Sequence, residues 1–294
     1  MTRISAQTGL GLYDRVADET ASIVIRRYST SFGLASRLLA APVRRHVENI
    51  YALVRVADEI VDGPATDAGL SPLDAAAVLH ELEAETEAGM TRGFSANLVV
   101  HAFARTAREC GITTDLTRPF FESMRADLTA TEHDQESFDR YVYGSAEVVG
   151  LMCLRSFLLG QNVTDETDAR LVHGARRLGA AFQKVNFLRD LSADFETLGR
   201  SYFPGVRVDS FTEADKVRLL DDIDADLRES AEALPLLPSS SRRAVALALG
   251  LFSELAVRLR ATPAERLVRA RVRVPDPVKF RIAASALAGR TPRQ

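Results

Sequence analysis

A chain of 294 residues, 46% of them apolar, can bury a large hydrophobic core as one helical domain or as two. Its formal net charge of −3 argues against a nucleic-acid-binding protein, because no basic surplus is available to neutralise phosphates. Two cysteines cannot build a disulfide framework, so a reduced cytoplasmic setting is the simplest interpretation. The longest apolar run, residues 244–252, is shorter than the ~20 residues that span a bilayer, and residues 1–13 do not resemble a secretion signal.

Helices are the elements expected along the chain, because Ala, Leu, Arg and Glu dominate and strand patterns are scarce. Glycine, proline and capping residues mark their ends. The expected helices span about residues 14–30, 42–62, 72 onward, 92–109, 117–128, 137–159, 165–198, 212–233, 240–260 and 278–288. With no internal repeat and no convincing linker, the pattern predicts a single all-α domain over residues 1–294.

Local signals mark several boundaries. Ser71 and Ser137 are each expected to cap the helix that follows. Residues 64–72 are expected to form a loop. Thr262-Pro-Ala-Glu265 has the pattern of a capping box with proline at the first helical position.

The first informative motif is an acidic cluster at helical spacing. Arg55 precedes Asp58, and Asp62 follows four residues later. Residues four apart stack along one helix face at ~6 Å intervals, so unpaired charges there repel one another. Apolar neighbours, with Tyr51 one turn earlier, indicate a partly buried helix in which carboxylates are costly unless paired or metal-bound.

A second cluster repeats the pattern. Asn186, Asp190 and Asp194 lie at i, i+4 and i+8, with Arg189 beside them. Mg²⁺ takes oxygen ligands and is commonly bound through a few carboxylates and substrate phosphates. One such row alone could be a solvated helix face. Two rows in apolar helices, with arginines beside them, favour a site for a diphosphate carried on Mg²⁺.

Other cofactor motifs are absent from the sequence. The five histidines are scattered and Cys110 lies far from Cys153, so no zinc spacing exists. No Gly-Lys-Ser/Thr phosphate loop occurs, and no G-x-G-x-x-G follows a strand, so a nucleotide-binding fold is not indicated. Cys153 is interpreted as a small buried side chain.

Several separated segments give the chain a family resemblance. They are Tyr28-Ser-Thr-Ser31-Phe32, Tyr51-x-x-x-Arg55-x-x-Asp58-Glu59-x-x-Asp62-Gly63, Tyr141-x-Tyr143-Gly144 through Val149-Gly150, Gln183-x-x-Asn186-x-x-Arg189-Asp190-x-x-x-Asp194 and Gly199-Arg200-Ser-Tyr202-Phe203-Pro204. Together they resemble the squalene/phytoene synthase family of head-to-head prenyl synthases, over roughly residues 20–285. The form of the first two segments is most similar to bacterial phytoene synthases.

The resemblance implies an all-α isoprenoid-synthase fold with a central helical cavity. It implies a prenyltransferase that condenses two geranylgeranyl diphosphates through prephytoene diphosphate to phytoene, in carotenoid biosynthesis. Mg²⁺ is the expected cofactor, Mn²⁺ could replace it, and no NADPH is expected. Prenyl diphosphates are the expected partners, with no nucleic acid and no obligate protein partner. The expected setting is cytoplasmic, with peripheral membrane association for product release left open.

The resemblance also implies roles for single residues. The implied metal ligands are Asp58, Asp62, Asn186, Asp190 and Asp194. The implied substrate-binding residues are Ser29, Ser31, Phe32, Tyr51, Arg55, Gln183 and Arg189. The implied catalytic residues are Asp58, Asp62, Asp190, Asp194, Arg55, Arg189 and Tyr141, the last for cation stabilisation or proton handling.

Simpler interpretations exist for some of these side chains. Phe32 and Tyr51 fit a hydrophobic core equally well, and Ser29 or Ser31 could only cap a helix. Arg189 could be an ion-pair partner of the neighbours of Asp190, although its planar fork suits phosphate.

Ser145 and Glu147 depart from the family pattern, which has small or apolar residues at these positions. Glu147 could bind a third cation, orient Tyr141 or face away from the cavity. The closest alternative activity is a C30 synthase that makes squalene or dehydrosqualene from two farnesyl diphosphates. The alternative from another class is a catalytically silent helical binding protein, which the oxygen ligands at all five metal positions disfavour.

Overall fold

The structure is a computed structural model of the chain. It describes residues 9–198 and 200–288, except for the side chains of residue 31 and residues 192–198. Within the described residues helices are the regular elements, and one isolated bridge joins Glu132 to Ser201. The prediction of an all-α fold is confirmed.

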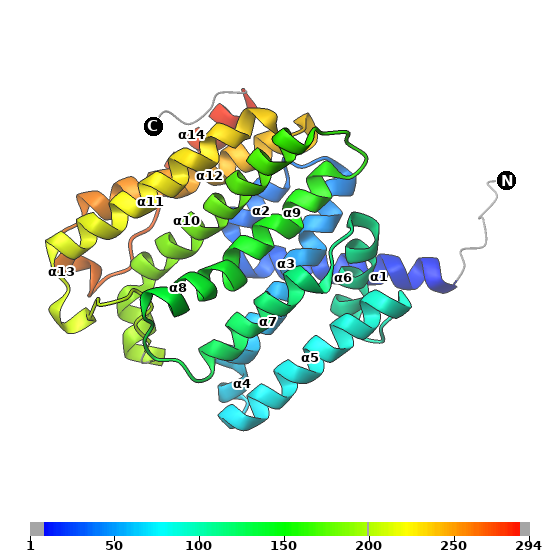
Figure 1. Cartoon of the computed structure of the whole chain (residues 1–294), viewed down its shortest axis with the longest axis horizontal. Coiled ribbons are helices and arrows are strands. Elements are labelled where there is room, and N and C mark those ends of the chain that lie inside the picture. Colours follow the sequence, from blue (N-terminus) through cyan, green and yellow to red (C-terminus); the bar gives the residue numbers. More distant parts are fainter. Residues whose placement is uncertain (1–8, 199, 289–294) are drawn as a thin grey trace.

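Helices follow one another along the chain with short connections (Figure 1). In order they are α1 (Gly9–Tyr28), α2 (Thr30–Ser36), α3 (Ala41–Val61), α4 (Pro64–Asp67), α5 (Pro72–Arg92), α6 (Leu98–Cys110), α7 (Thr114–Asp127), α8 (Gln135–Val142), the π-helical turn η1 (Tyr143–Glu147), α9 (Val148–Leu158), α10 (Asp165–Leu198), the 3-10 turn η2 (Val208–Ser210), α11 (Glu213–Ala233), the 3-10 turn η3 (Leu234–Leu236), α12 (Ser239–Ala261), α13 (Ala264–Leu267) and α14 (Asp276–Leu287).

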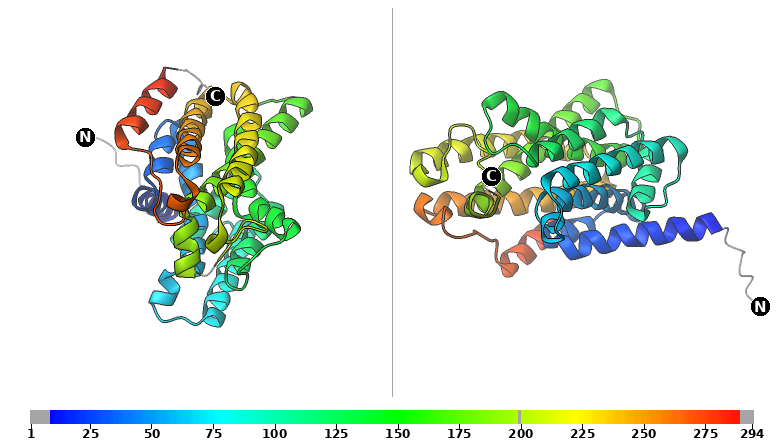
Figure 2. Two further views of the ribbon diagram at one scale, coloured as in Figure 1. Left: turned by 90° about the vertical axis from the view of Figure 1, so that its left-hand side faces the viewer. Right: turned by 90° about the horizontal axis from the view of Figure 1, so that it is seen from below.

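Two clusters of buried apolar side chains hold the helices together. The first is built mainly from α8 to α12, and the second from α1, α3, α5, α6 and α7. Helix α9 serves both, because Leu154 belongs to the first cluster and Met152 to the second. In Figure 1, α10, α11 and α12 lie side by side, and Figure 2 shows α1 along the edge of the molecule toward the N-terminus. None of the described helices is long and apolar enough to cross a membrane.

The local sequence explains where helix α3, which carries the first acidic cluster, begins and ends. Pro42 stands in the first turn, where its missing N–H costs nothing. Ile50, Leu53 and Ala57 follow at helical spacing and are buried against neighbouring helices. Gly63 then adopts a φ of 139°, a conformation that L side chains rarely take, so the helix ends just before it.

Most predicted helices are confirmed, with corrected boundaries. The segment 165–198 forms one helix, α10, as expected. A helix start at residue 92 is wrong, because Gly93 ends α5 in the left-handed conformation and Asn97 caps α6 through the Val99 N–H. Ser71 caps α5 as predicted, and Asp74 completes a capping box there.

Two further local predictions are wrong. The expected loop 64–72 contains α4, which Pro64 opens in its first turn. Thr262 does not form a capping box, because its position at the end of α12 lets its hydroxyl donate to the Arg258 carbonyl at 2.8 Å. Residues 30–36, which had no separate assignment, form α2 with Ser29 as N-cap.

The predicted helix 137–159 is divided by a π-helical turn. Its cap is Asp134, whose Oδ1 accepts from the Ser137 N–H at 2.8 Å, so the expected cap at Ser137 is wrong. The extra residue in the turn η1 lets the backbone at Gly144 lie directly against α7. A Cβ at Gly144 would stand 2.2 Å from the carbonyl oxygen of Pro119 and 2.2 Å from Ser123 Oγ. Only glycine fits here.

We expect Gly144→Ala to lower the free energy of unfolding by about 1–3 kcal/mol, because overpacking forces α7 and η1 apart. Gly9→Ala is the matched control, since a Cβ there would meet no described atom within 4 Å. Urea denaturation measures both variants. An unchanged unfolding midpoint for Gly144→Ala would contradict the close crossing.

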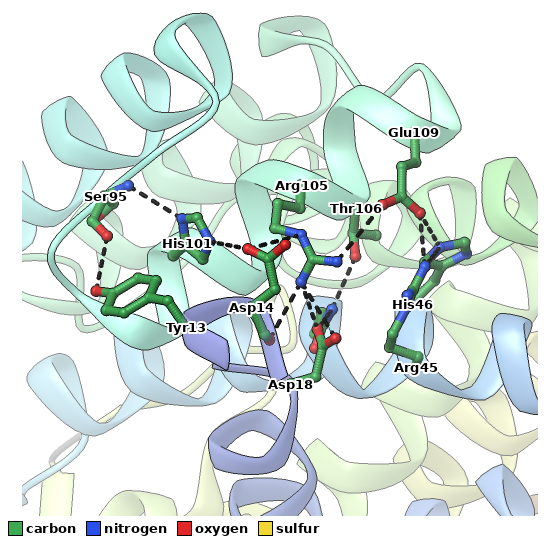
Figure 3. A network of polar contacts seen from close by, with 11 residues as sticks. Tyr13, Asp14, Asp18, Arg45, His46, Ser95, His101, Arg105, Thr106 and Glu109 are labelled. Atoms are coloured by element: carbon green, nitrogen blue, oxygen red, sulfur yellow. Dashed lines mark hydrogen bonds and ion pairs between the residues drawn. The ribbon is translucent and has the colours of Figure 1, made fainter. Parts of the chain in front are cut away.

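A polar network ties α1 to α6 (Figure 3). His101 is fully buried, and the Ser95 N–H donates to its Nδ1 at 3.3 Å. The other ring nitrogen, Nε2, therefore carries the proton and donates to Asp14 Oδ1 at 2.8 Å. Arg105 reaches Asp18 Oδ2 at 3.2 Å in the same network. None of the residues implied in catalysis takes part, so its role is to fix the two helices.

Candidate active site

An apolar cavity of about 290 Å³ lies among the helices. Helices α3 and α10 form two of its walls. The lining residues recur at helical spacing from Val47 to Val54 on α3 and from Leu171 to Asn186 on α10. The remaining walls come from α1, α2, η1, α9, α11, η3 and α12.

Both acidic clusters continue these lining faces. Asp58 follows Val54 after one turn of α3, and Asp190 follows Asn186 after one turn of α10. Along one face of each helix, apolar side chains that line the cavity are therefore followed by acidic side chains.

Two observations place the clusters at the same end of the cavity. The Phe32 ring lies 6.4 Å from that of Tyr51 on α3 and 5.6 Å from that of Phe182 on α10, so these two residues stand at one level. Arg200, two residues beyond the end of α10, donates to Asp62 Oδ1 at the end of α3, at 2.7 Å. The two helices therefore run in the same direction, and their acidic ends lie toward the same end of the cavity, which we call the mouth.

Arg55 and its acidic neighbours form the α3 side of this mouth. Arg55 Nη1 donates to Asp58 Oδ2 at 2.6 Å, and Nη2 donates to Glu59. The guanidinium carbon lies 4.6 Å from the centre of the Tyr28 ring, and Nε is buried without a hydrogen-bond partner among the described residues. Burial and the charge of Asp62 raise the pKa of Asp58 to about 7.

The α10 side carries Gln183 and Asn186, which line the cavity. Asp190 is bracketed by two arginines: Arg189 Nε donates to it at 3.0 Å, and Arg271 Nε lies 2.7 Å from its Oδ1. Arg189 thus forms an ion pair, but with Asp190 itself and not with the neighbours of Asp190. The side chain of Asp194 lies outside the described residues.

The acidic pair on α3 fits a magnesium ion. Within the described part of the chain, no three His, Cys, Asp or Glu side chains converge on a common metal position. Mg²⁺ needs no such cage, because it usually binds one or two carboxylates and completes its octahedron with water and substrate phosphates. Asp58 and Asp62 repel one another, and a divalent cation would relieve that repulsion.

The residues implied in substrate binding differ in their surroundings. Phe32 and Tyr51 both line the cavity. Ser29 Oγ accepts from the Phe32 N–H at 3.1 Å and so acts as the cap of α2, as the simpler interpretation has it. The side chain of Ser31 lies outside the described residues.

Tyr141 is buried behind the mouth and is held by residues that spacing did not single out. Its hydroxyl donates to Asp127 Oδ2 at 2.8 Å, and the Tyr202 hydroxyl donates to Asp127 Oδ1 at 3.2 Å. Arg200 lies 3.5 Å from the same carboxylate. Burial raises the pKa of Asp127 to about 7 despite Arg200, and raises that of Tyr141 well above its ordinary value.

Asp127 and Arg271 are the site residues that sequence reasoning missed. Asp127 stands at the end of an ordinary helix with no motif around it. Arg271 belongs to the irregular segment after α13. By contrast, Arg200 and Tyr202 lie in one of the family segments, which was a usable signal.

Glu147 and Ser145, the two departures from the family pattern, differ in whether they line the cavity. Glu147 Oε2 accepts from Arg176 Nε at 2.6 Å, and it is not among the residues that line the cavity. This agrees with the alternative that Glu147 faces away, whereas Tyr141 is oriented by Asp127. Ser145 does line the cavity, and so does Cys153, which is only half-buried by its neighbours.

Close backbone crossings shape the deep part of the cavity. A Cβ on Gly179 would lie 2.6 Å from the Ala146 carbonyl oxygen, so η1 rests directly on α10 there. Nearer the start of α10, a Cβ on Gly174 would lie 2.3 Å from the Ala233 Cβ. Both Gly174 and Ala233 line the cavity.

Two relatives of named activity match most of the chain. The chain is 27% identical over 257 residues to a 15-cis-phytoene synthase of Paracoccus sp. (strain N81106 / MBIC 01143), covering 82% of this chain and 81% of that protein. It is 28% identical over 207 residues to a 4,4'-diapophytoene synthase of Staphylococcus haemolyticus (strain JCSC1435), covering 69% of this chain and 66% of that protein.

The fold has close counterparts among solved structures. A dehydrosqualene synthase in complex with ligand superimposes with a TM-score of 0.76 at 21% identity, covering 95% of this chain and 98% of that one. This likeness confirms the all-α isoprenoid-synthase fold. The sequence model described as squalene/phytoene synthase matches residues 25–277. The chain therefore belongs to the squalene/phytoene synthase family.

Proposed function

We propose that the protein is a phytoene synthase, which condenses two geranylgeranyl diphosphates head to head through prephytoene diphosphate. The observation that supports the proposal is an apolar cavity whose lining faces on α3 and α10 both continue into acidic residues, Asp58 on α3 and Asp190 on α10. A prenyl diphosphate has this same division, with a head that carries several negative charges and a long hydrocarbon tail.

Ionisation of an allylic diphosphate requires the leaving charge to be neutralised. Bound Mg²⁺ would supply this charge, held by Asp58 and Asp62 from α3 and by Asn186 and Asp190 from α10. Arg55 is suited to bind a phosphate oxygen, because its buried Nε still lacks a partner among the described residues.

The cavity walls protect the hydrocarbon cation that remains. Its lining is dominated by apolar side chains, which exclude water that would otherwise capture the cation. Phe32 and Tyr51 present aromatic rings to the cavity, and such rings stabilise a desolvated cation by about 2 kcal/mol. Tyr141, fixed by Asp127, remains the candidate for cation stabilisation or proton handling close to the mouth.

The C40 product is favoured by the phytoene-synthase form of the motifs and by the Paracoccus relative. The similar identity to a 4,4'-diapophytoene synthase supports the C30 alternative from farnesyl diphosphate. Cyclopropyl rearrangement followed by loss of a proton needs no hydride, so we propose that NADPH is not required.

Product analysis tests the proposal. Geranylgeranyl diphosphate and farnesyl diphosphate are each incubated with the purified protein and Mg²⁺, with and without NADPH, and the extracts are separated by chromatography. We expect phytoene from geranylgeranyl diphosphate without NADPH. Consumption of farnesyl diphosphate alone would establish the C30 alternative, and a product that forms only with NADPH would contradict the proposed reaction without hydride. A protein that consumes neither diphosphate would be the silent relative.

A further inference from the structure

Ser145 is a buried hydroxyl without a partner in the cavity wall. It belongs to the π-helical turn η1, is only 9% exposed, and lines the cavity. Its Oγ makes no hydrogen bond to any described residue. A buried hydroxyl without a partner costs free energy, so its retention in an otherwise apolar wall requires an explanation.

Other buried serines nearby are satisfied by their own helix. Ser156, in α9 after the same turn, donates to the Cys153 carbonyl at 2.7 Å. Ser36, which also lines the cavity, donates to the Gly33 carbonyl at 3.1 Å. Ser145, in the turn η1, does not donate to a carbonyl of its own helix. The carbonyl four residues earlier, that of Tyr141, instead accepts from Ser123 Oγ at 3.1 Å. The Ser145 hydroxyl is left for the cavity.

The position of Ser145 along the cavity can be given relative to α10. Its neighbour Ala146 crosses α10 at Gly179. From that crossing, Gln183 is about one helical turn toward the mouth and Asn186 about two turns, roughly 10 Å along the axis. A diphosphate bound at the mouth would place the first carbons of its prenyl chain in this interval. The Ser145 hydroxyl therefore lies at the inner end of the interval that the first prenyl carbons would occupy.

We propose that Ser145 is a catalytic residue whose Oγ lone pairs face the carbocation, an assignment that rests on the proposed function. In this step the C–O bond to the diphosphate breaks and its electron pair leaves with the diphosphate. The hydroxyl forms no covalent bond and transfers no proton. It contributes an ion–dipole interaction with the positive carbon.

This interaction is absent from the ground state. A neutral hydrocarbon chain offers no charge to the hydroxyl, so Ser145 remains unsatisfied when substrate binds. Only the cation provides a favourable partner. Interactions made in the transition state but not in the ground state raise kcat without tightening substrate binding. Removal of the hydroxyl should therefore slow the reaction and relieve the cost of burying it.

The test compares Ser145→Ala with Ser156→Ala, the same chemical change on a satisfied serine outside the cavity lining. Steady-state release of diphosphate is measured with geranylgeranyl and with farnesyl diphosphate, and Tm is measured for each protein. For Ser145→Ala we expect kcat to fall roughly 10- to 100-fold, KM to stay within about twofold, and Tm to be unchanged or higher. Ser156→Ala should keep its kcat and lose stability, because it removes a satisfied hydrogen bond.

A fall in kcat smaller than about tenfold for Ser145→Ala would overturn the assignment. A fall in kcat accompanied by a lower Tm would also overturn it, because it would mark a structural role. If the unmodified protein releases no diphosphate from either substrate, the proposed function fails and takes this inference with it. An active parent with an equally active Ser145→Ala removes the inference alone.

Discussion

Replacing Asp58 by asparagine is expected to abolish turnover and, in metal-free buffer at pH 8, to raise Tm. The carboxylate is proposed as a ligand of the cation that neutralises the departing diphosphate, and weakening that electrostatic stabilisation is expected to lower kcat by about 10²–10³-fold. The same carboxylate destabilises the metal-free fold, because burial and the charge of Asp62 raise the pKa of Asp58 to about 7. Activity and stability should therefore change in opposite directions.

The sign of the stability effect depends on pH. An aspartate whose pKa is higher in the folded than in the unfolded protein penalises folding once pH exceeds the unfolded value, and the penalty is complete above the folded value. The gain in Tm from Asp58→Asn should thus be largest near pH 8, decrease between about pH 7 and pH 4, and vanish below that range.

Calorimetry across this pH range in EDTA, with parallel assays in Mg²⁺, measures both effects. Asp67→Asn is the matched control, because Asp67 is an exposed aspartate at the end of α4. It should keep both activity and Tm. Near-parental activity of Asp58→Asn would remove Asp58 from the metal set, and a Tm that falls in parallel with activity would assign it a structural role.

Removal of divalent cations is expected to eliminate product formation. Without a cation, Asp58 and Asp62 repel the incoming diphosphate instead of binding it, so we expect a loss of about 10³-fold in EDTA. Added Mg²⁺ or Mn²⁺ in excess of the chelator should restore the rate, since both prefer oxygen ligands. Product release is measured after exhaustive dialysis against EDTA.

Pre-saturated Mg²⁺–EDTA controls for direct effects of the chelator. It should leave the rate unchanged. If the dialysed protein still turned over at the full rate, the proposed ionisation at a metal-bound diphosphate would be wrong.

The fold class was predictable from sequence because its signals are local. Helix α10 begins directly after a threonine and has acidic residues in its first turn. Its predicted bounds of 165–198 are confirmed. The predictions that failed depend on contacts made elsewhere in the chain. The π-helical turn η1, for example, accompanies the close approach of α7 to Gly144, which helical periodicity in residues 137–159 cannot reveal.

In the candidate site, too, local patterns were predictable and contacts between distant segments were not. Spacing alone indicates that Asp58 and Asp62 share a face of α3, and the structure has them close enough for their charges to interact. The bond from Arg200 to Asp62 joins residues 138 positions apart, and no pattern within either helix encodes it. Asp127 and Arg271 were missed for this reason. The single domain and the roles in binding, metal coordination and catalysis stay predictions.

The crossing of Gly174 and Ala233 has a consequence for how this cavity can evolve. Two of the smallest side chains already meet there, and an added methyl group on Gly174 would overlap that of Ala233. A larger side chain on either residue would force α10 and α11 apart, and neither residue has more than a methyl group to lose. Single substitutions at this crossing therefore cannot enlarge the cavity, and they cannot reduce it without disturbing the helix pair. A change in the length of the accepted chain must come from the other walls.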